Sequence, residues 1–380
     1  MNAINSALIC LLILSGSLTS IYGQLSESAT VSLITCAKGD DIYNMYGHSA
    51  IRITDPVVSM DQVYNFGIFD FKEPNFIMKF LRGKLLYRVE KQAMRRFMFG
   101  YVQEKRSVRE QVLNVDQYGA NELYAALEEN SKPKNKYYLY DFFFDNCTTR
   151  LRDLFESEIV GFQYPEAPLR AHTYRSLLDV YTYRWPFTDF GQDLIVGSVA
   201  DGEAGLRGQC FLPEFMEAVL ARSSIGHLPA VRETKIILDH EKLDQSRSSK
   251  PFNWPLLLFG ILLFIEFLLF IFKSTSKGVR LYDRACYWVL GIGGLVIAFM
   301  WYGTDHLATK DNLNLLWMSP LFLFFSMGSS RFFTIVLAIF SVLSLVLSIW
   351  LQSLHPCAIA LIVIILLKLG RKVRTESAVT

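Results

Sequence analysis

The sequence predicts an α+β domain followed by an all-α bundle of about five transmembrane helices, and three observations lead to this prediction. The 380 residues divide sharply in composition, with most acidic residues before Asn253 and mainly Leu, Ile, Phe and Val over 254–369. The first part contains both strand-like and helix-like segments. The second part holds five apolar segments, most of them near the ~20 residues that a membrane-spanning helix needs.

The chain begins with a segment typical of a secretory signal peptide. An apolar core over 7–14 is followed by small and polar residues up to Gly23, which predicts a signal of residues 1–23. No Lys or Arg precedes the core, so an uncleaved anchor is the alternative. In both cases we expect the next domain, 24–243, to be exported. The net charge of +2 gives no indication of a nucleic-acid partner.

Three strands are predicted early in the exported domain. Residues 29–35 form an apolar run, 49–53 alternates apolar and polar side chains, and 62–69 is a further strand. Gly47 lets the backbone turn into the second strand. We therefore expect His48 at the mouth of a sheet.

The remaining elements of this domain are expected to be mostly helical. Helices are predicted at 94–107, 120–130, 185–201 and 211–221. The apolar run 137–144 is interpreted as a buried strand, after which a helix begins at Cys147. An aromatic-rich stretch at 71–86 carries three cations and suits either a membrane surface or a core under a solvated face. A charged, serine-containing linker is predicted at 244–253.

Cys147 is the candidate nucleophile. A cysteine at a helix start lies against unpaired N–H groups and the positive end of the helix dipole, which favours the thiolate. His48 is the one histidine that precedes it in the chain and is the candidate base, with His172 ranked below it. Asn65, on the next strand, is the candidate for holding the imidazole in the right tautomer. The alternative is a core thiol and a structural histidine.

Other residues of the exported domain have less certain roles. Tyr46 is close enough in sequence to His48 to line a cleft. Arg52 lies on the same strand face as His48 and suits a lipid phosphate, although a structural ion pair is the favoured interpretation. Cys36 and Cys210 suit a disulfide in an oxidising compartment, with two buried thiols as the alternative.

Polar residues in the membrane part are further candidates for substrate binding. The five apolar segments lie at about 254–272, 285–303, 313–328, 332–352 and 355–370. With the first domain outside, the basic loop 273–284 and the tail 371–380 fall inside, as the positive-inside rule requires. Glu266 lies within the first segment, where a carboxylate is costly unless it is paired, so a binding role and a structural hydrogen bond are both open. Asp305 and His306 fall at the outer face, on the side of Cys147, where head-group binding, docking of the first domain or an ordinary loop are possible.

Four motifs carry a resemblance to a known family. They are Tyr46-Gly-His-Ser-Ala-Ile-Arg-Ile53, Tyr64-Asn-Phe-Gly-Ile-Phe-Asp70, Asp145-Asn-Cys-Thr-Thr-Arg150 and Thr304-Asp-His-Leu-Ala-Thr-Lys-Asp-Asn-Leu-Asn-Leu-Leu-Trp317. The order of histidine, polar residue and cysteine resembles the circularly permuted branch of the NlpC/P60 papain-like superfamily. More closely, the motifs resemble the Lnb family of lipoprotein N-acyltransferases.

This resemblance implies an enzyme of the inner (cytoplasmic) membrane with its catalytic domain in the periplasm. The implied reaction moves an acyl chain from a phospholipid, through a thioester on Cys147, to the amine of a lipoprotein's N-terminal cysteine. Neither a cofactor nor a metal is expected, since the sequence has six histidines and no His-Glu-x-x-His or Cys-x-x-Cys pattern. The alternatives are a membrane-anchored cysteine peptidase or amidase acting on cell-wall peptide, and a non-enzymatic membrane receptor or scaffold.

Overall fold

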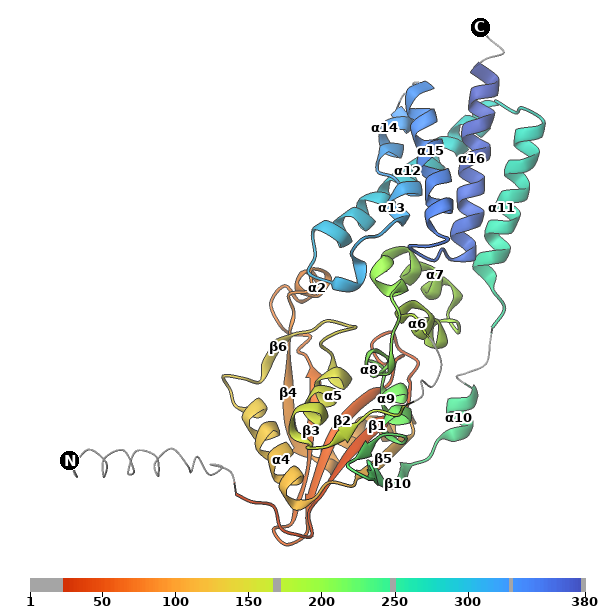
Figure 1. Cartoon of the computed structure of the whole chain (residues 1–380). Helices are drawn as coiled ribbons and strands as arrows, with labels where there is room; N and C mark the ends of the chain where they lie inside the picture. Colours follow the sequence, from red (N-terminus) through yellow and green to blue (C-terminus); the bar gives the residue numbers. More distant parts are fainter. Residues whose placement is uncertain (1–22, 167–171, 247–250, 328–330, 377–380) are drawn as a thin grey trace, which may run out of the picture.

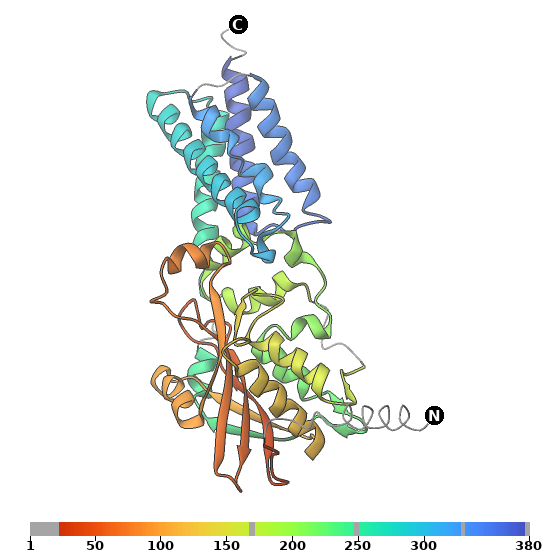
Figure 2. The same ribbon diagram turned by 90° about the vertical axis from the view of Figure 1, so that its left-hand side faces the viewer.

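The computed structural model describes residues 23–166, 172–246, 251–327 and 331–376. It has two parts: an antiparallel sheet with helices packed against it, and a helix bundle that extends from one end of this domain (Figure 1, Figure 2). The succession of a mixed domain and an all-α domain confirms that part of the prediction. The predicted signal segment lies outside the described residues, except for Gly23.

Seven strands form the main sheet, in the order β10-β5-β1-β2-β3-β4-β6, with every neighbouring pair antiparallel. Their bounds are Thr30–Cys36 (β1), His48–Asp55 (β2), Met60–Ile68 (β3), Leu86–Ala93 (β4), Val108–Leu113 (β5), Tyr137–Leu139 (β6) and Val231–Leu238 (β10). The three early strands that the sequence predicts are confirmed as β1, β2 and β3. A second sheet consists of Phe162–Gln163 (β7), Ser224–Ile225 (β8) and Leu228–Pro229 (β9).

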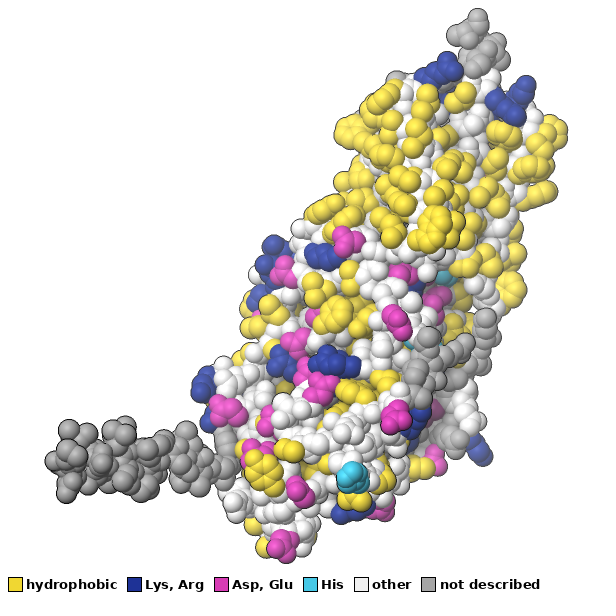
Figure 3. Space-filling view, in the orientation of Figure 1, with side chains coloured by type: hydrophobic (Ala, Val, Ile, Leu, Met, Phe, Trp, Pro, Cys, Tyr) yellow, Lys and Arg dark blue, Asp and Glu magenta, His cyan; other side chains and the backbone are white. Residues whose placement is uncertain are grey.

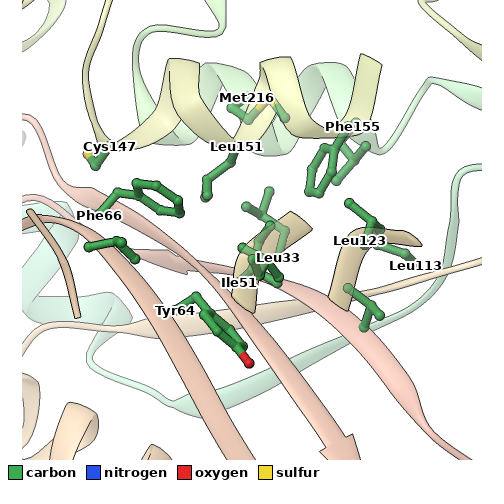
Figure 4. Packing of buried hydrophobic residues seen from close by; sticks show 14 of the residues in the cluster. Leu33, Ile51, Tyr64, Phe66, Leu113, Leu123, Cys147, Leu151, Phe155 and Met216 are labelled. Atoms are coloured by element: carbon green, nitrogen blue, oxygen red, sulfur yellow. The ribbon is translucent and has the colours of Figure 1, made fainter. Parts of the chain in front are cut away.

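Helices cover both faces of the main sheet. The helices over one face are Gln117–Ser131 (α4), Cys147–Glu158 (α5) and Pro213–Leu220 (α9). They pack around a core that includes Leu33, Ile51 and Phe155 (Figure 4). Helix α3 (Met94–Glu104) packs on the other face, against residues such as Ala50 and Val63. Residues two apart in a strand point to the same face of the sheet. His48 therefore points to the same face as Ala50, and Asn65 to the same face as Val63, which is the face covered by α3.

The run 137–144 is not a single strand, contrary to the prediction. Strand β6 ends at Leu139, and a tight turn follows in which Asp141 and Asp145 exchange two backbone hydrogen bonds. The Asp141 carboxylate accepts hydrogen bonds from the N–H groups two and three residues further on, at 3.0 and 2.9 Å. Such local bonding by aspartate competes with strand pairing. The turn delivers the chain directly to Cys147.

A layer of short helices lies between the sheet and the bundle (Figure 1). It consists of Tyr174–Thr182 (α6), Pro186–Ile195 (α7), Ser198–Asp201 (η1) and Leu206–Gln209 (α8). Of these, α6 and η1 contribute residues to a buried cluster that also contains Phe143 and Phe211. The helical content predicted at 185–201 is confirmed as α7 and η1.

The charged segment before the bundle contains a strand and a helix. Residues from Val231 form the edge strand β10, whose side chains are mostly exposed, and Glu241–Ser246 form helix α10. Exposed charges are common on edge strands because they discourage pairing with other chains. Helix α10 therefore occupies the first residues of the linker predicted at 244–253.

The bundle contains helices at all five predicted apolar segments. Their bounds are Trp254–Ile271 (α11), Lys277–Tyr302 (α12), Asn314–Trp317 (α13), Leu321–Met327 (α14), Arg331–Leu347 (α15) and Pro356–Glu376 (α16). By length and composition, α11 and α12 are the described helices that suit a membrane crossing, and the α13–α14 segment and α15 are shorter. Figure 3 shows hydrophobic side chains over most of the bundle surface, with Lys and Arg at its far end.

Two boundaries in the bundle differ from the prediction. The basic loop at 273–284 is largely helical, because α12 already begins at Lys277, where the Ser276 side chain caps it by accepting from the Val279 N–H. The segment 313–328 is broken, since Pro320 has no N–H to continue a helix and separates α13 from α14.

The loop between α12 and α13, residues 303–313, joins the bundle to the sheet domain. The Gly197 N–H donates to the Ala308 carbonyl at 2.9 Å, the Asn312 amide donates to the Leu194 carbonyl at 2.9 Å, and the Asn314 amide donates to the Asp193 carbonyl at 3.0 Å. Helix α2 (Phe76–Leu81), in the connection from β3 to β4, lies beside the same loop. Several polar contacts therefore fix the two parts relative to each other.

Candidate active site

Cys147 is the first residue of helix α5. The side chain of the preceding Asn146 accepts hydrogen bonds from the Thr148 and Thr149 N–H groups at 2.8 and 2.9 Å, and Thr149 bonds back to the Asn146 N–H. This capping box fixes the start of the helix. The N–H of Cys147 has no acceptor within the helix, and the helix dipole favours negative charge at this position. The sequence Asp-Asn-Cys-Thr-Thr therefore builds a site for a thiolate.

Two glycines give the space in which His48 meets Cys147. Gly47 has a φ of +78°, and a Cβ there would lie 2.7 Å from the Cys36 carbonyl oxygen, so only glycine fits before His48. Gly67, at the end of β3, has a φ of +88°. A Cβ on Gly67 would lie 3.3 Å from the Cβ of Cys147 and 3.9 Å from the Cε1 of His48. The absence of that side chain leaves room in front of the sulfur.

Asn65 fixes the orientation of the imidazole. The Nε2 of His48 lies 2.6 Å from the Asn65 side-chain oxygen, which can only accept, so Nε2 carries a proton. The other ring nitrogen, Nδ1, is then the one left for the hydrogen bond between His48 and Cys147. The structure thus brings the three predicted residues, Cys147, His48 and Asn65, into one hydrogen-bonded arrangement.

The electrostatics favour a thiolate and imidazolium pair. Burial alone would raise the pKa of Cys147, but the charge of His48, its hydrogen bond, and hydrogen bonds from Thr148 and the Ser49 N–H outweigh burial and lower this pKa. Burial alone would lower the pKa of His48, and the Cys147 thiolate and the Asn65 hydrogen bond together raise it. The Thr148 hydroxyl lies 3.6 Å from the sulfur. Both shifts favour transfer of the proton from sulfur to imidazole.

A tyrosine that sequence reasoning missed completes the surroundings of Cys147. The hydroxyl of Tyr138, on β6, would lie 4.0 Å from a Cβ on Gly67, the point that also approaches Cys147 and His48. The residue is 8% exposed, and its hydroxyl donates to no acceptor among the described residues, while the Gly67 N–H lies close enough to act on its oxygen. The Arg150 guanidinium packs over its ring at 4.1 Å. The sequence signal was hidden because the run 137–144 was interpreted as an uninterrupted strand.

A polar hollow of about 310 Å³ opens beside the imidazole. His48 and Asn65 form part of its wall, and charged residues from α3 and the segment after it, such as Arg96 and Arg106, form another part. Cys147 is not among its lining residues. The hollow therefore reaches the base from the α3 side of the sheet.

The structure does not bring Arg52 to the sulfur. Its guanidinium contacts Asp61 at 2.7 Å and Glu110 at 3.1 Å, and four residues of extended strand separate it from His48. The Tyr46 ring packs between Phe142 and Tyr181, and its hydroxyl donates to Gln192. Both predicted binding residues thus have their polar groups engaged within the protein.

Asp305 and His306 contact the segment around α2 instead of Cys147. The Asp305 N–H donates to the Arg82 carbonyl at 3.0 Å, and its carboxylate lies 3.5 Å from the Lys84 ammonium. The Nε2 of His306 lies 3.0 Å from the Phe80 carbonyl. Of the three interpretations that the sequence left open, docking is the one that these contacts support.

Glu266 lies within the bundle between two cations. It is 0% exposed, and its carboxylate lies 2.8 Å from both the Lys368 ammonium and the Arg371 guanidinium. Asp283 contacts the same two cations at 2.8 Å. These four residues belong to α11, α12 and α16 in the half of the bundle remote from the sheet. The contacts agree with the structural interpretation of Glu266.

The other cysteines of the sheet domain differ from Cys147. Cys36 and Cys210 are free, buried thiols, which is the second of the two possibilities that the sequence left open. Burial raises the pKa of each to about 12. The alternative base, His172, has its Nδ1 3.3 Å from the Ser176 hydroxyl. Within the ranges that the structure describes, no three His, Cys, Asp or Glu side chains gather as metal ligands.

The models of two domain families match this chain. The Lnb N-terminal periplasmic domain matches residues 24–180, and the Lnb transmembrane domain matches residues 244–377. The first match contains Cys147, His48 and Asn65, and the second contains the helix bundle. No curated protein and no solved structure matches the chain.

Proposed function

The chain belongs to the Lnb family, and from this we propose that it is a lipoprotein N-acyltransferase that works through an acyl-thioester on Cys147. It is a membrane protein with a periplasmic domain and a transmembrane domain. The observation that carries the proposal is the hydrogen-bonded arrangement of Cys147, His48 and Asn65. The domain that contains it is joined to the transmembrane domain by polar contacts such as that of Asn312. A nucleophile in this place suits a substrate that resides in the membrane surface.

In the first half-reaction the Cys147 thiolate attacks the carbonyl carbon of a phospholipid acyl ester. The carbonyl oxygen becomes an oxyanion, and the bond between the carbonyl carbon and the glycerol oxygen then breaks. His48, protonated at Nδ1 by the thiol proton, gives that proton to the departing glycerol oxygen. The products are a lysophospholipid and an acyl-thioester.

The oxyanion needs donors that point into the space in front of the sulfur. The Cys147 N–H, unpaired within helix α5, is one such donor. The Tyr138 hydroxyl is the second, because it is buried, lies beside the gap at Gly67 and donates its proton to no other group among the described residues. Both donors are in place before substrate arrives, which lowers the cost of forming the oxyanion.

In the second half-reaction the α-amino group of a lipoprotein's N-terminal cysteine attacks the thioester. His48 takes a proton from the attacking nitrogen, the carbon–sulfur bond breaks, and Cys147 leaves as a thiolate. The product is an amide, so the lipoprotein gains a third acyl chain. No step needs a metal or a redox cofactor.

We place the catalytic domain, 24–243, in the periplasm and the bundle in the inner membrane with five crossings. Lys273, Arg331 and Lys372 lie toward the far end of the bundle, and the positive-inside rule assigns such an end to the cytoplasm. The order of His48, Asn65 and Cys147 along the chain supports assignment of the sheet domain to the permuted NlpC/P60 architecture.

The test is the intact mass of the purified full chain after incubation with phospholipid, before and after neutral hydroxylamine. We expect a mass increase equal to one acyl group, which hydroxylamine removes and which is missing in Cys147→Ala. When a diacylated lipopeptide with a free amine is then added as the acceptor, we expect the acyl group to move to that amine. The absence of any adduct with all phospholipids tested would contradict the proposal.

The second candidate function is a cysteine peptidase or amidase, which the polar hollow beside His48 favours. A hollow lined by Arg96, Glu104 and Gln92 suits a peptide better than an acyl chain. In this case Cys147 alkylates readily but gives no hydroxylamine-sensitive lipid adduct, and cell-wall peptide is cleaved. An acyl-thioester with phospholipid excludes this candidate, and the hollow then suits the acceptor peptide. The non-enzymatic scaffold predicts a Cys147 that resists alkylation.

A further inference from the structure

The connection between β3 and β4 exposes a group of large apolar side chains. Phe71 is 67% exposed, Ile77 72% and Met78 55%, and the neighbouring Phe80 and Leu81 are also exposed. Helix α2 contains no buried residue. A small group of exposed apolar residues in one segment is a feature of surfaces that contact a partner or a membrane.

The base of this segment is nevertheless held firmly. Phe76 stacks on Phe69 with ring centroids 5.9 Å apart, and Phe69 packs against Tyr87 of β4 at 5.2 Å. The apolar side chains are thus presented outward from a fixed base. They are not the loose end of a long loop.

The position of α2 relative to the bilayer follows from its contacts with the end of α12. The loop after α12 bonds to the Phe80 and Arg82 carbonyls through His306 and Asp305, each at 3.0 Å. Helix α12 ends with the stacked pair Trp301 and Tyr302, and Tyr302 is 72% exposed. Tryptophan and tyrosine favour the membrane–water interface. Helix α2 therefore lies at the height of the lipid head groups.

The charges of the segment suit the same position. Lys79, Arg82 and Lys84 alternate with the apolar residues. Lys79 pairs with Glu73 at 2.7 Å and Lys84 lies 3.5 Å from Asp305, while Arg82 is exposed. Apolar side chains in the acyl boundary with cations at the phosphates are the pattern of an interfacial anchor. Helix α2 lies near the end of the bundle that faces the sheet domain, opposite the far end where Lys and Arg gather (Figure 1, Figure 3).

We propose that Phe71 and α2 insert into the outer leaflet of the membrane, and that this leaflet supplies the acyl donor to Cys147. The occupant of the apolar surface is thus a phospholipid leaflet. The segment follows directly from β3, which carries Asn65 and Gly67, so a lipid displaced beside α2 is close to the reaction space. Insertion of α2 into the leaflet does not depend on the proposed acyl transfer. The supply of the acyl donor from that leaflet does depend on it.

The experiment for insertion is spin labelling of the full chain in phospholipid vesicles. Ile77→Cys and Tyr118→Cys are made in the Cys147→Ala background; both residues are more than 60% exposed, and Tyr118 lies on α4, away from the bundle. We expect the label at position 77 to collide preferentially with oxygen, which concentrates in lipid, and the label at 118 to collide preferentially with a water-soluble nickel chelate. The Cys147→Ala chain without an added cysteine gives the background.

Preferential collision with the nickel chelate at position 77 would overturn insertion. Weak collision with both reagents would overturn it too, because it would mean that protein covers the segment. Since this measurement uses an inactive chain, its outcome is independent of the proposed chemistry.

Donor supply is tested with Ile77→Ser combined with Met78→Ser. We expect the rate of thioester formation from vesicle lipids to fall by about tenfold, with the rate from a short-chain phospholipid in detergent unchanged. An equal loss with both donors, or no loss with vesicles, would overturn donor supply. If the unsubstituted chain forms no thioester with either donor, the acyl transfer itself fails while the spin-label result stands.

Discussion

The protein buries charged or ionisable groups in two places, the Cys147 site and the Glu266 cluster, and the two are built on opposite principles. Each charge of the Glu266 cluster has at least one opposite charge at 2.8 Å, so no charge is left without an ionic partner, although the Glu266 Oε2 and the Arg371 Nε make no well-directed hydrogen bond among the described residues. At Cys147 the thiol, the imidazole and the amide form a chain, but the Tyr138 hydroxyl and the space at Gly67 are left open.

The difference teaches how to separate a structural cluster from a reactive one. A buried charge without an opposite charge costs several kcal/mol, so a cluster that only stabilises the fold pairs each of its charges. A reactive site keeps free volume and a donor for substrate, because substrate has to complete it. The free volume at Gly67 beside Cys147 therefore agrees with the proposed reactive site, whereas the contacts of Glu266 agree with a role in holding three helices together.

The largest expected effect comes from removing the nucleophile. Cys147→Ala takes away the one thiol of the sheet domain whose pKa is lowered, so we expect thioester formation and acyl transfer to fall by about 10⁴-fold or more. Intact mass spectrometry and lipopeptide acylation measure this. The matched control is Cys210→Ala, another buried cysteine, which should keep the adduct. A hydroxylamine-sensitive adduct on Cys147→Ala would show that another residue is the nucleophile.

The next prediction concerns Glu266 and should affect stability instead of chemistry. Glu266→Gln leaves Lys368 and Arg371 with Asp283 as their remaining acidic partner, and we expect a loss of about 3 kcal/mol in the free energy of unfolding. Unfolding in detergent measures it, with thioester yield per folded molecule as a second readout that should not change. Glu233→Gln breaks an exposed pair with Lys235 and should cost less than about 1 kcal/mol. Lost activity with unchanged stability would instead assign Glu266 to substrate binding.

A smaller effect is expected from the open donor. Tyr138→Phe keeps the ring under Arg150 and removes the hydroxyl, so we expect thioester formation to slow by about 10²-fold. The rate of Cys147 alkylation should hardly change, because alkylation forms no oxyanion. The control is Tyr87→Phe, a buried tyrosine in the same cluster. Equal slowing of alkylation and acylation would mean that the hydroxyl only supports the fold.

The sequence predicted which three polar residues would lie together better than it predicted the elements around them. Cys147, His48 and Asn65 are marked by local signals, namely a capped helix start, a glycine before a strand and a polar residue on the next strand, and each signal lies within a few residues. Tyr138 carries no such signal. Its position depends on the turn formed by Asp141, which interrupts an apolar run that looks like a strand.

Partners of charged residues could not be predicted, because they depend on packing between distant segments. Glu266 meets Lys368 and Arg371 from a helix about a hundred residues away, and Asp305 meets the α2 segment from even further. Helix ends in the bundle were also missed, since hydropathy marks where side chains are apolar and not where hydrogen bonding stops. The segment 277–284 therefore forms the first turns of α12, although many of its residues are polar or charged.

The smallest expected effect comes from Asn65. It tests whether a neutral hydrogen-bond partner sets the pKa values of His48 and Cys147, a role that no residue of the Glu266 cluster has. The amide oxygen accepts from the Nε2 of His48 and contributes to its raised pKa, which in turn stabilises the Cys147 thiolate. Asn65→Ala removes this contribution, so the pKa of His48 falls and that of Cys147 rises, and the pH range in which the ion pair exists narrows from both ends. Asn65→Asp puts a carboxylate in the same place, which raises the pKa of His48 and extends the range to higher pH.

The rate of Cys147 alkylation as a function of pH measures both limits of this range. For Asn65→Ala we expect about a tenfold slower reaction at neutral pH and a rise that begins at higher pH than in the unsubstituted chain. For Asn65→Asp we expect the high-pH limit to move upward. A merely structural asparagine would lower both rates without moving either limit. A high-pH limit that falls in Asn65→Ala and rises in Asn65→Asp would therefore identify Asn65 as a positioning residue that acts on Cys147 through His48.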